Sequence, residues 1–226
     1  MSPGVRSWTL CGLMATPTEL RNALVRLTGD AEADLAALWA QLTPGTVGDG
    51  LFTVLPALVG DYGDAAATLT AEWYEQARAE LNVPGTYAAS LTTADLGAEA
   101  LAGWGTDLAR NDWDTALARI SGGLTKRVMT ASRDTVMTNT DSDPQARGWQ
   151  RKARPDGCGF CQMVAGRGTV FRGRTTASFA SHDHCRCVAL PAFGGRPVPV
   201  RPYTPTSRNI TDADRARARA WIAANL

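Results

Sequence analysis

Four of the five cysteines and both histidines of this 226-residue chain lie between residues 158 and 187. A Cys-x-x-Cys pair opens the segment and a mixed Cys/His cluster closes it. Two thiolates on one tight turn can bind the same tetrahedral ion, and a second cluster can complete its coordination. The candidate donors are Cys158, Cys161, His182, His184, Cys185 and Cys187.

We interpret this pattern as a structural zinc site. Residues 145–195 are too short and too polar to be stabilised by apolar burial alone, and a metal can supply the missing folding free energy. Zinc is favoured over iron because mixed Cys/His ligands at short spacing suit a tetrahedral, redox-inert ion. Two alternatives stay open, a pair of disulfides and a redox-active Cys-x-x-Cys. Cys11 lies far from the cluster and is expected to be a lone buried thiol.

Before this segment the chain reads as helical. Thr18 is the expected cap of a first helix that ends at Pro44-Gly45, with leucines at steps of three, four and seven. A second helix is expected to start or kink at Pro56 and to stop at Val83-Pro84-Gly85. Residues 84–106 are mixed, with short helical pieces expected.

A third apolar pattern runs from about Thr106 to Asn139. Gly122-Gly123 lies in its middle and predicts a bend or break, because each glycine costs a helix roughly 1 kcal/mol relative to alanine. The turn-rich stretch from Asp141 to Pro144 ends the pattern. Short strands are expected afterwards, near Trp149–Lys152, Thr169–Phe171 and Arg186–Leu190, followed by an extended segment at 194–206 and a short helix from about Thr211 to Trp221.

The charge changes sign where the helical pattern ends. Residues 1–140 contain 9 Lys/Arg and 16 Asp/Glu, whereas residues 141–226 contain 14 and 6. We therefore expect an α+β protein with an acidic, mainly helical, partner-binding region at 1–143. A basic, zinc-stabilised α/β domain with an extended C-terminal tail is expected at 144–226.

The composition is that of an ordinary globular protein, with 44% hydrophobic and 20% charged residues. Its longest apolar stretch is far shorter than the ~18 residues of a membrane-spanning helix, so a spanning protein is excluded. The N-terminal segment is weak as a signal peptide, which predicts synthesis in the cytosol.

The Cys/His pattern resembles a known family. Cys158-x-x-Cys161 followed by His182-x-x-Cys185-Arg186-Cys187 is similar to the C-terminal signature of the Mu F-like, or head morphogenesis, minor capsid proteins of tailed bacteriophages. The intervening Arg167-Gly168 and aromatic Phe171 resemble the version in phages of actinobacteria. The resemblance covers about residues 145–193, and His184 falls at a variable position of the signature.

The resemblance implies a low-copy virion component, made in the host cytoplasm and located in the capsid interior or near the portal. It implies a role in head assembly, portal association or DNA packaging and delivery. The matching metal positions are Cys158, Cys161, His182, Cys185 and Cys187. The implied partners are the portal protein or the major capsid protein, with possible non-specific contact with packaged DNA and no membrane.

Two alternatives remain. Proteins of this kind are also described as capsid maturation proteases. However, Ser181, His182 and Asp183 are consecutive and cannot form a relay, and His-Glu-x-x-His is missing. We therefore expect no enzymatic activity. The arginine-rich second half could instead belong to a zinc-containing nucleic-acid-binding protein, although its spacing does not match a helix-in-groove zinc finger.

Overall fold

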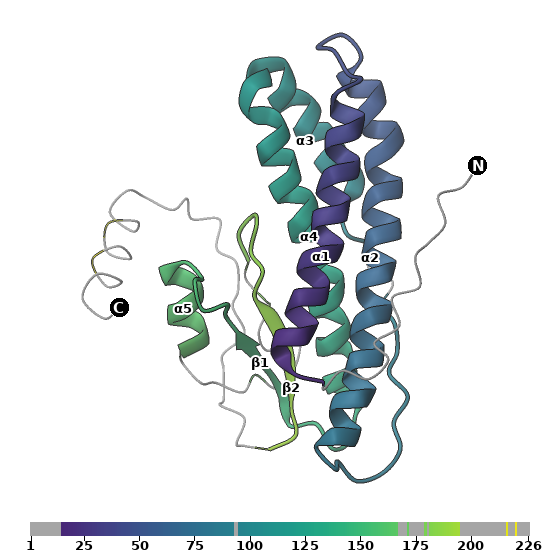
Figure 1. Cartoon of the computed structure of the whole chain (residues 1–226), viewed down its shortest axis with the longest axis vertical. Coiled ribbons are helices and arrows are strands. Elements are labelled where there is room, and N and C mark those ends of the chain that lie inside the picture. Colours follow the sequence, from purple (N-terminus) through teal and green to yellow (C-terminus); the bar gives the residue numbers. More distant parts are fainter. Residues whose placement is uncertain are drawn as a thin grey trace.

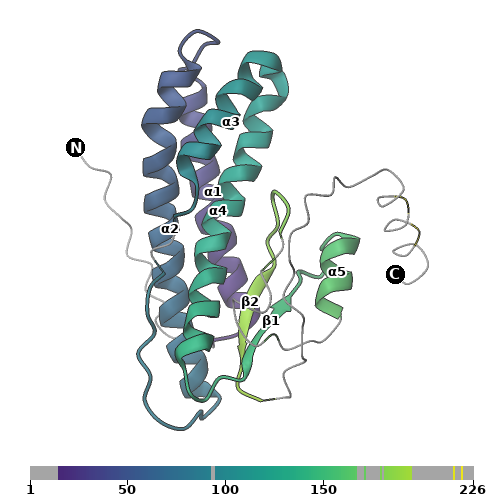
Figure 2. The ribbon, with the colours of Figure 1, turned by 180° about the vertical axis from the view of Figure 1, so that it is seen from behind.

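The fold was analysed in a computed structural model, which describes residues 15–92, 95–166, 171, 179, 181–194, 216 and 220. Four helices, α1 to α4, lie side by side in an elongated bundle (Figure 1). A two-stranded sheet and a short helix, α5, lie beside one half of that bundle, as the reverse view also shows (Figure 2). The described part of the chain is therefore a mainly helical α+β protein, as the sequence predicts.

Helix α1 spans Pro17–Trp39 and begins with a capping box. The Thr16 side chain accepts a hydrogen bond from the Glu19 backbone, and the Glu19 carboxylate accepts one from the Thr16 N–H. The predicted cap at Thr18 is therefore wrong. Thr16 caps the helix because Pro17 suits its first position and Glu19 stands at the third, where a carboxylate completes the box.

Helix α2 spans Val47–Glu80 and contains Pro56 in its interior. The predicted start at Pro56 is wrong, since the helix begins at Val47. A proline removes one backbone hydrogen bond, at a cost of about 3 kcal/mol. Leu51, Leu55 and Val59 on either side are completely or almost completely buried, and their burial offsets this cost.

Helices α3, Ala98–Asn111, and α4, Trp113–Ser142, replace the single helix expected from about residue 106 to residue 139. They separate at Asp112, whose side chain accepts a hydrogen bond from the Thr115 N–H and so caps α4. Helix α4 then runs unbroken through Gly122-Gly123, so the break expected there is wrong. Its end at Ser142 confirms the predicted stop.

Strand β1, Gly148–Lys152, pairs antiparallel with β2, Val188–Ala192, with Gln150 opposite Leu190. Both strands were predicted, the second two residues too early. Of the third predicted strand, Phe171 is described and forms an isolated bridge with Trp149. The expected 194–206 segment and C-terminal helix lie outside the described residues, apart from Gly194, Ala216 and Ala220, and Cys11 lies outside them too.

The main core joins all four long helices and includes Val188 and Leu190 of β2. A smaller cluster joins Val136 and Met137 at the end of α4 to Trp149 of β1. Both strands thus pack against α4, which places the segment before β2 along this helix.

Candidate metal centre

The five metal ligands proposed from the sequence come from two short segments. Cys158 directly precedes α5, Gly159–Gly166, and Cys161 lies in its first turn. His182, Cys185 and Cys187 lie in the segment that leads into β2. A turn positions the first pair, because the Gly157 N–H donates to the Arg154 carbonyl oxygen at 3.0 Å.

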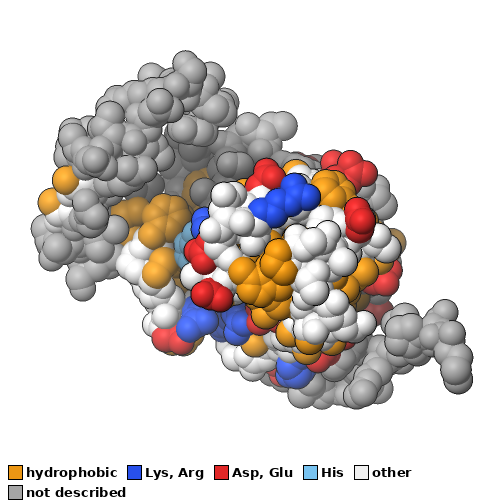
Figure 3. Space-filling view, turned by 90° about the horizontal axis from the view of Figure 1, so that it is seen from above, with side chains coloured by type: hydrophobic (Ala, Val, Ile, Leu, Met, Phe, Trp, Pro, Cys, Tyr) orange, Lys and Arg blue, Asp and Glu red, His pale blue; other side chains and the backbone are white. Residues whose placement is uncertain are grey.

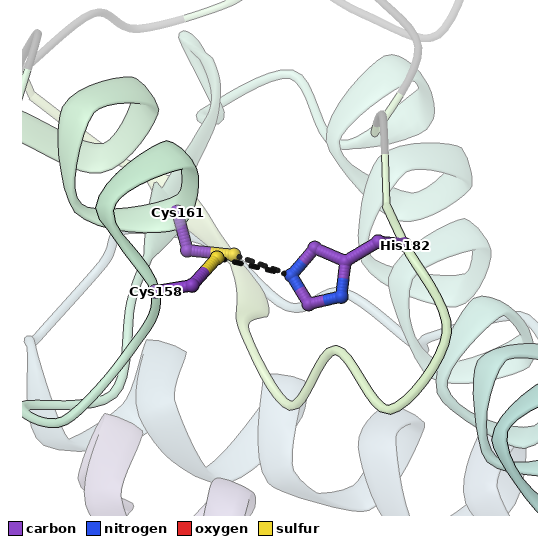
Figure 4. A group of neighbouring side chains, drawn as sticks. All are labelled: Cys158, Cys161 and His182. Atoms are coloured by element: carbon purple, nitrogen blue, oxygen red, sulfur yellow. Dashed lines mark hydrogen bonds between the residues drawn. The ribbon is translucent and has the colours of Figure 1, made fainter. Parts of the chain in front are cut away.

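The side chains of these two segments meet. Nε2 of His182 lies 3.2 Å from Sγ of Cys158 and 3.3 Å from Sγ of Cys161 (Figure 4). Cys161 is shared with a second group, in which the sulfur atoms of Cys161, Cys185 and Cys187 all lie within 4.8 Å of one another. The structure therefore brings all five residues into two groups that have Cys161 in common.

The separation of the sulfur atoms fits shared metal coordination better than a disulfide. Sγ of Cys161 lies 3.8 Å from Sγ of Cys185, and all four described cysteines are free thiols. A disulfide needs an S–S distance of about 2.05 Å. Two thiolates bound to one tetrahedral zinc at about 2.3 Å lie about 3.8 Å apart.

His182 has the orientation of a metal-binding imidazole. Its Nδ1 lies 2.6 Å from the carbonyl oxygen of Asp183. Because a carbonyl oxygen can only accept a hydrogen bond, Nδ1 carries the proton and Nε2 of the neutral ring has a free lone pair. That lone pair belongs to the atom that faces the two sulfurs. A backbone carbonyl that holds the second ring nitrogen is typical of metal-bound histidines.

The electrostatics divide the thiols into easily and poorly ionised ones. Hydrogen bonding with Cys187 lowers the pKa of Cys185 to about 4, helped by the positive charge of Arg133, and raises the pKa of Cys187. Burial raises the pKa of Cys161 to about 11. Burial opposes ionisation of Cys158, but hydrogen bonds from Cys161 and His182 more than compensate and lower its pKa.

The site is closed on one side and open on the other. Cys161, Cys185 and Cys187 are each about 2% exposed or less and form a small cluster with Ala153. Cys158 and His182 are exposed. A site of this shape suits an ion that holds two segments together.

His184, the sixth candidate donor in the sequence, is not placed with the other five. It belongs to neither group of metal-ligating atoms in the described residues. Its backbone has a φ of 57°, in the left-handed region, and its N–H donates to the Gly122 carbonyl oxygen of α4 at 3.4 Å. The residue therefore packs the turn onto the helix.

Arg133 of α4 is a site residue that our reading of the sequence missed. Its guanidinium is buried and donates to the carbonyl oxygens of Cys185 at 2.6 Å and of Cys187 at 2.9 and 3.0 Å. Burial lowers its pKa to about 10, so it is cationic at neutral pH. The sequence contains one signal for this role. Arg133 lies four residues after Met129 and three before Val136, so a helix places it on the same apolar face as these two residues.

Two partly exposed ion pairs also join the segment that contains His182, Cys185 and Cys187 to the bundle. Lys126 Nζ lies 3.6 Å from Asp183 Oδ1, and Arg186 Nη2 lies 3.7 Å from Glu32 Oε1. Such partly exposed pairs contribute little, about 0–1 kcal/mol each. Packing and the buried guanidinium are therefore the stronger attachments.

The donor set fits zinc. Thiolates and an imidazole suit a tetrahedral, redox-inert ion, and each of the two groups that share Cys161 brings three such donors together. An ion bound to Nε2 of His182 would occupy the lone pair that a general base needs.

A family model described as VG15 protein matches residues 14–210. No curated protein and no solved structure matches the chain. Among the described helices, none combines the length and the hydropathy that crossing a bilayer requires.

Proposed function

Because the chain belongs to the VG15 protein family, a family of viral gene products, we propose that it is a minor capsid, or head morphogenesis, protein of a tailed phage. Family membership indicates a phage protein. The finer assignment rests on the Mu F-like signature. The observation that carries it is the convergence of the signature's two halves, Cys158-x-x-Cys161 and His182-x-x-Cys185-x-Cys187, on one cluster.

In this proposal the metal centre is structural. The ion would be held by Cys158, Cys161 and two or more of His182, Cys185 and Cys187. When bound, zinc would join α5 to the segment before β2, and its binding free energy would add to the packing of the two strands on α4. The second half, residues 144–226, is thus proposed to be a compact basic part of the virion protein, with its arginines available to packaged DNA.

The bundle is the proposed partner-binding region, and its partner is the portal protein or the inner face of the major capsid protein. Two of its aromatic side chains are exposed, Phe52 of α2 at 51% and Trp104 of α3 at 41%. The ring centroids of Trp39 and Trp113 lie 4.4 Å apart, with the rings tilted by 30°, where α1 ends and α4 begins. Viewed from above, hydrophobic side chains gather among charged ones on the bundle (Figure 3). Apolar surface framed by charge is typical of protein-binding sites.

Incorporation into phage heads tests this function. The full-length chain, tagged and supplied during infection, is expected to copurify with heads and virions at low copy number. Phe52→Glu and Trp104→Glu variants are expected to retain their helical content and lose incorporation. Leu81→Glu is the matched control, because Leu81 is also exposed, at 65%, but lies at the far end of α2. Absence of the wild-type chain from heads would contradict the proposal.

Co-expression with the major capsid protein addresses the protease alternative. We expect no processing of the capsid protein by this chain. Processing that is abolished when one serine or histidine of the chain is replaced would favour the protease.

A further inference from the structure

The guanidinium of Arg133 is a buried positive charge with no described carboxylate beside it. It is 1% exposed, and none of the described carboxylates lies within ion-pair distance of its guanidinium. An arginine stays protonated in proteins, and a buried charge is strongly destabilising unless it is paired. Something on this side of α4 must therefore provide negative charge.

The hydrogen bonds of Arg133 show which segment it serves. Nε and Nη2 donate to the carbonyl oxygens of Cys185 and Cys187, more than 50 residues farther along the chain. One face of the guanidinium lies over the Phe179 ring, 4.5 Å from its centroid. Neutral carbonyls and an aromatic face orient the cation but do not neutralise it.

One donor of the guanidinium remains. Nη1 is buried and has no hydrogen-bond partner among the described atoms. The candidate anions nearby are the thiolates of Cys185 and Cys187, whose backbone carbonyls the guanidinium holds, and that of Cys161, whose sulfur lies within 4.8 Å of both of theirs. A buried donor left unpaired is costly, and a metal-bound thiolate is an acceptor that carries negative charge.

We propose that Arg133 is the internal counter-cation of the metal–thiolate centre, a positioning residue that couples metal binding to the packing of the Cys185–Cys187 turn on α4. This inference rests on the proposed metal centre. A divalent ion with three thiolates and a neutral imidazole has a net charge of minus one, and one with four thiolates has minus two. Arg133 supplies one positive charge against either, and the buried guanidinium of Arg151 lies over the same Phe179 ring.

A thermodynamic cycle tests the assignment in the full-length chain. Unfolding of wild type and Arg133→Met is measured with bound zinc and with excess chelator, and zinc affinity is measured by competition with a chromophoric chelator. We expect Arg133→Met to weaken zinc binding at least tenfold, because residues that hold metal ligands typically contribute about 10- to 100-fold in affinity. The stability lost on substitution should be larger with zinc than without it. A residue with a merely structural role would cost the same in both states.

Two further variants separate charge from packing. Arg133→Lys keeps the charge and is expected to lose less zinc affinity than Arg133→Met. Arg127→Met is the matched control, since Arg127 also lies on α4 and donates to backbone carbonyls, but to those of Gly97 and Gly123 and not to those of Cys185 and Cys187. We expect it to change zinc affinity less than twofold.

The outcomes separate the two proposals. Wild-type protein that binds no zinc would overturn the metal centre and the role of Arg133 with it. Wild type and Arg133→Met with equal zinc affinity, or equal losses in the Met and Lys variants, would overturn the counter-cation alone. If Arg133→Met does not fold, the zinc affinities of Arg133→Lys and Arg127→Met are compared instead. A loss no larger in Arg133→Lys than in Arg127→Met would then overturn the counter-cation.

Discussion

The backbone N–H of His184 donates to the carbonyl oxygen of Gly122 at 3.4 Å, so the turn that contains three of the proposed metal ligands lies directly on the backbone of α4. A Cβ atom at Gly122 would come within 2.6 Å of His184 Nε2 and 3.1 Å of Asp183 Cβ. The glycine thus provides the space into which the turn packs.

Gly122→Ala is expected to loosen this turn without unfolding the bundle. Alanine favours the helix by about 1 kcal/mol, but its methyl group displaces His184. We expect faster amide hydrogen exchange over residues 182–186 and weaker zinc retention. The control is Gly29→Ala, because a Cβ there meets nothing within 4 Å. Unchanged exchange in Gly122→Ala would contradict the proposed packing.

Removal of the metal is expected to release the cysteine cluster. Protein purified without added metal should contain one zinc ion per chain, and Cys161→Ser should lose it, because Cys161 belongs to both donor groups. Elemental analysis measures the content, and a thiol reagent measures the exposure of the cysteines after chelation. Cys11→Ser is the control and should retain the metal. A metal-free wild type with an unchanged fold would contradict this prediction.

A buried ion pair should matter far more for stability than an exposed one. Arg78 Nε lies 2.7 Å from Asp143 Oδ2, and the carboxylate is completely buried. Arg78→Met leaves that charge unpaired, which typically costs about 3–5 kcal/mol in the free energy of unfolding. Arg154→Met removes the exposed pair with Asp156 and should cost much less, because solvent screens such a pair. Denaturant unfolding measures both, and equal losses would be the contrary result.

Stability is expected to fall at alkaline pH because of Tyr74. Burial and the Asp143 carboxylate raise the pKa of its phenol above the usual value of about 10. The folded state therefore keeps a proton that the unfolded state loses. The contribution is constant below pH 10 and is lost as the pH rises above it.

Tyr74→Phe should reduce this pH dependence. A smaller decrease of the unfolding free energy with pH is expected to remain, because burial also raises the pKa values of Tyr62 and Tyr87. The free energy of unfolding at increasing alkaline pH measures the effect, and an identical slope in the variant would contradict it.

The features that the sequence predicted correctly depend on neighbours along the chain. The apolar periods of α1 and α2, the stop before Pro144 and the Cys158-x-x-Cys161 turn follow from the 3.6-residue period and from turn chemistry. Each half of the cluster is also local in the sequence, because its donors lie within six residues of one another.

Contacts between distant residues decided the rest. Pro56 lies inside α2 because buried apolar side chains on both sides, Leu55 and Val59 among them, outweigh its lost hydrogen bond. Gly122 receives the His184 turn and Gly123 faces Leu101, so these glycines mark contact sites in an unbroken helix.

The role of Arg133 likewise depends on the tertiary structure. Its partners, Cys185 and Cys187, lie more than 50 residues away, and only folding brings their carbonyl groups to α4. The sequence by itself determined which side chains can bind a metal, because donor chemistry is a property of each residue. The tertiary structure decided what surrounds and compensates those donors, because burial and charge pairing depend on which distant segments pack together.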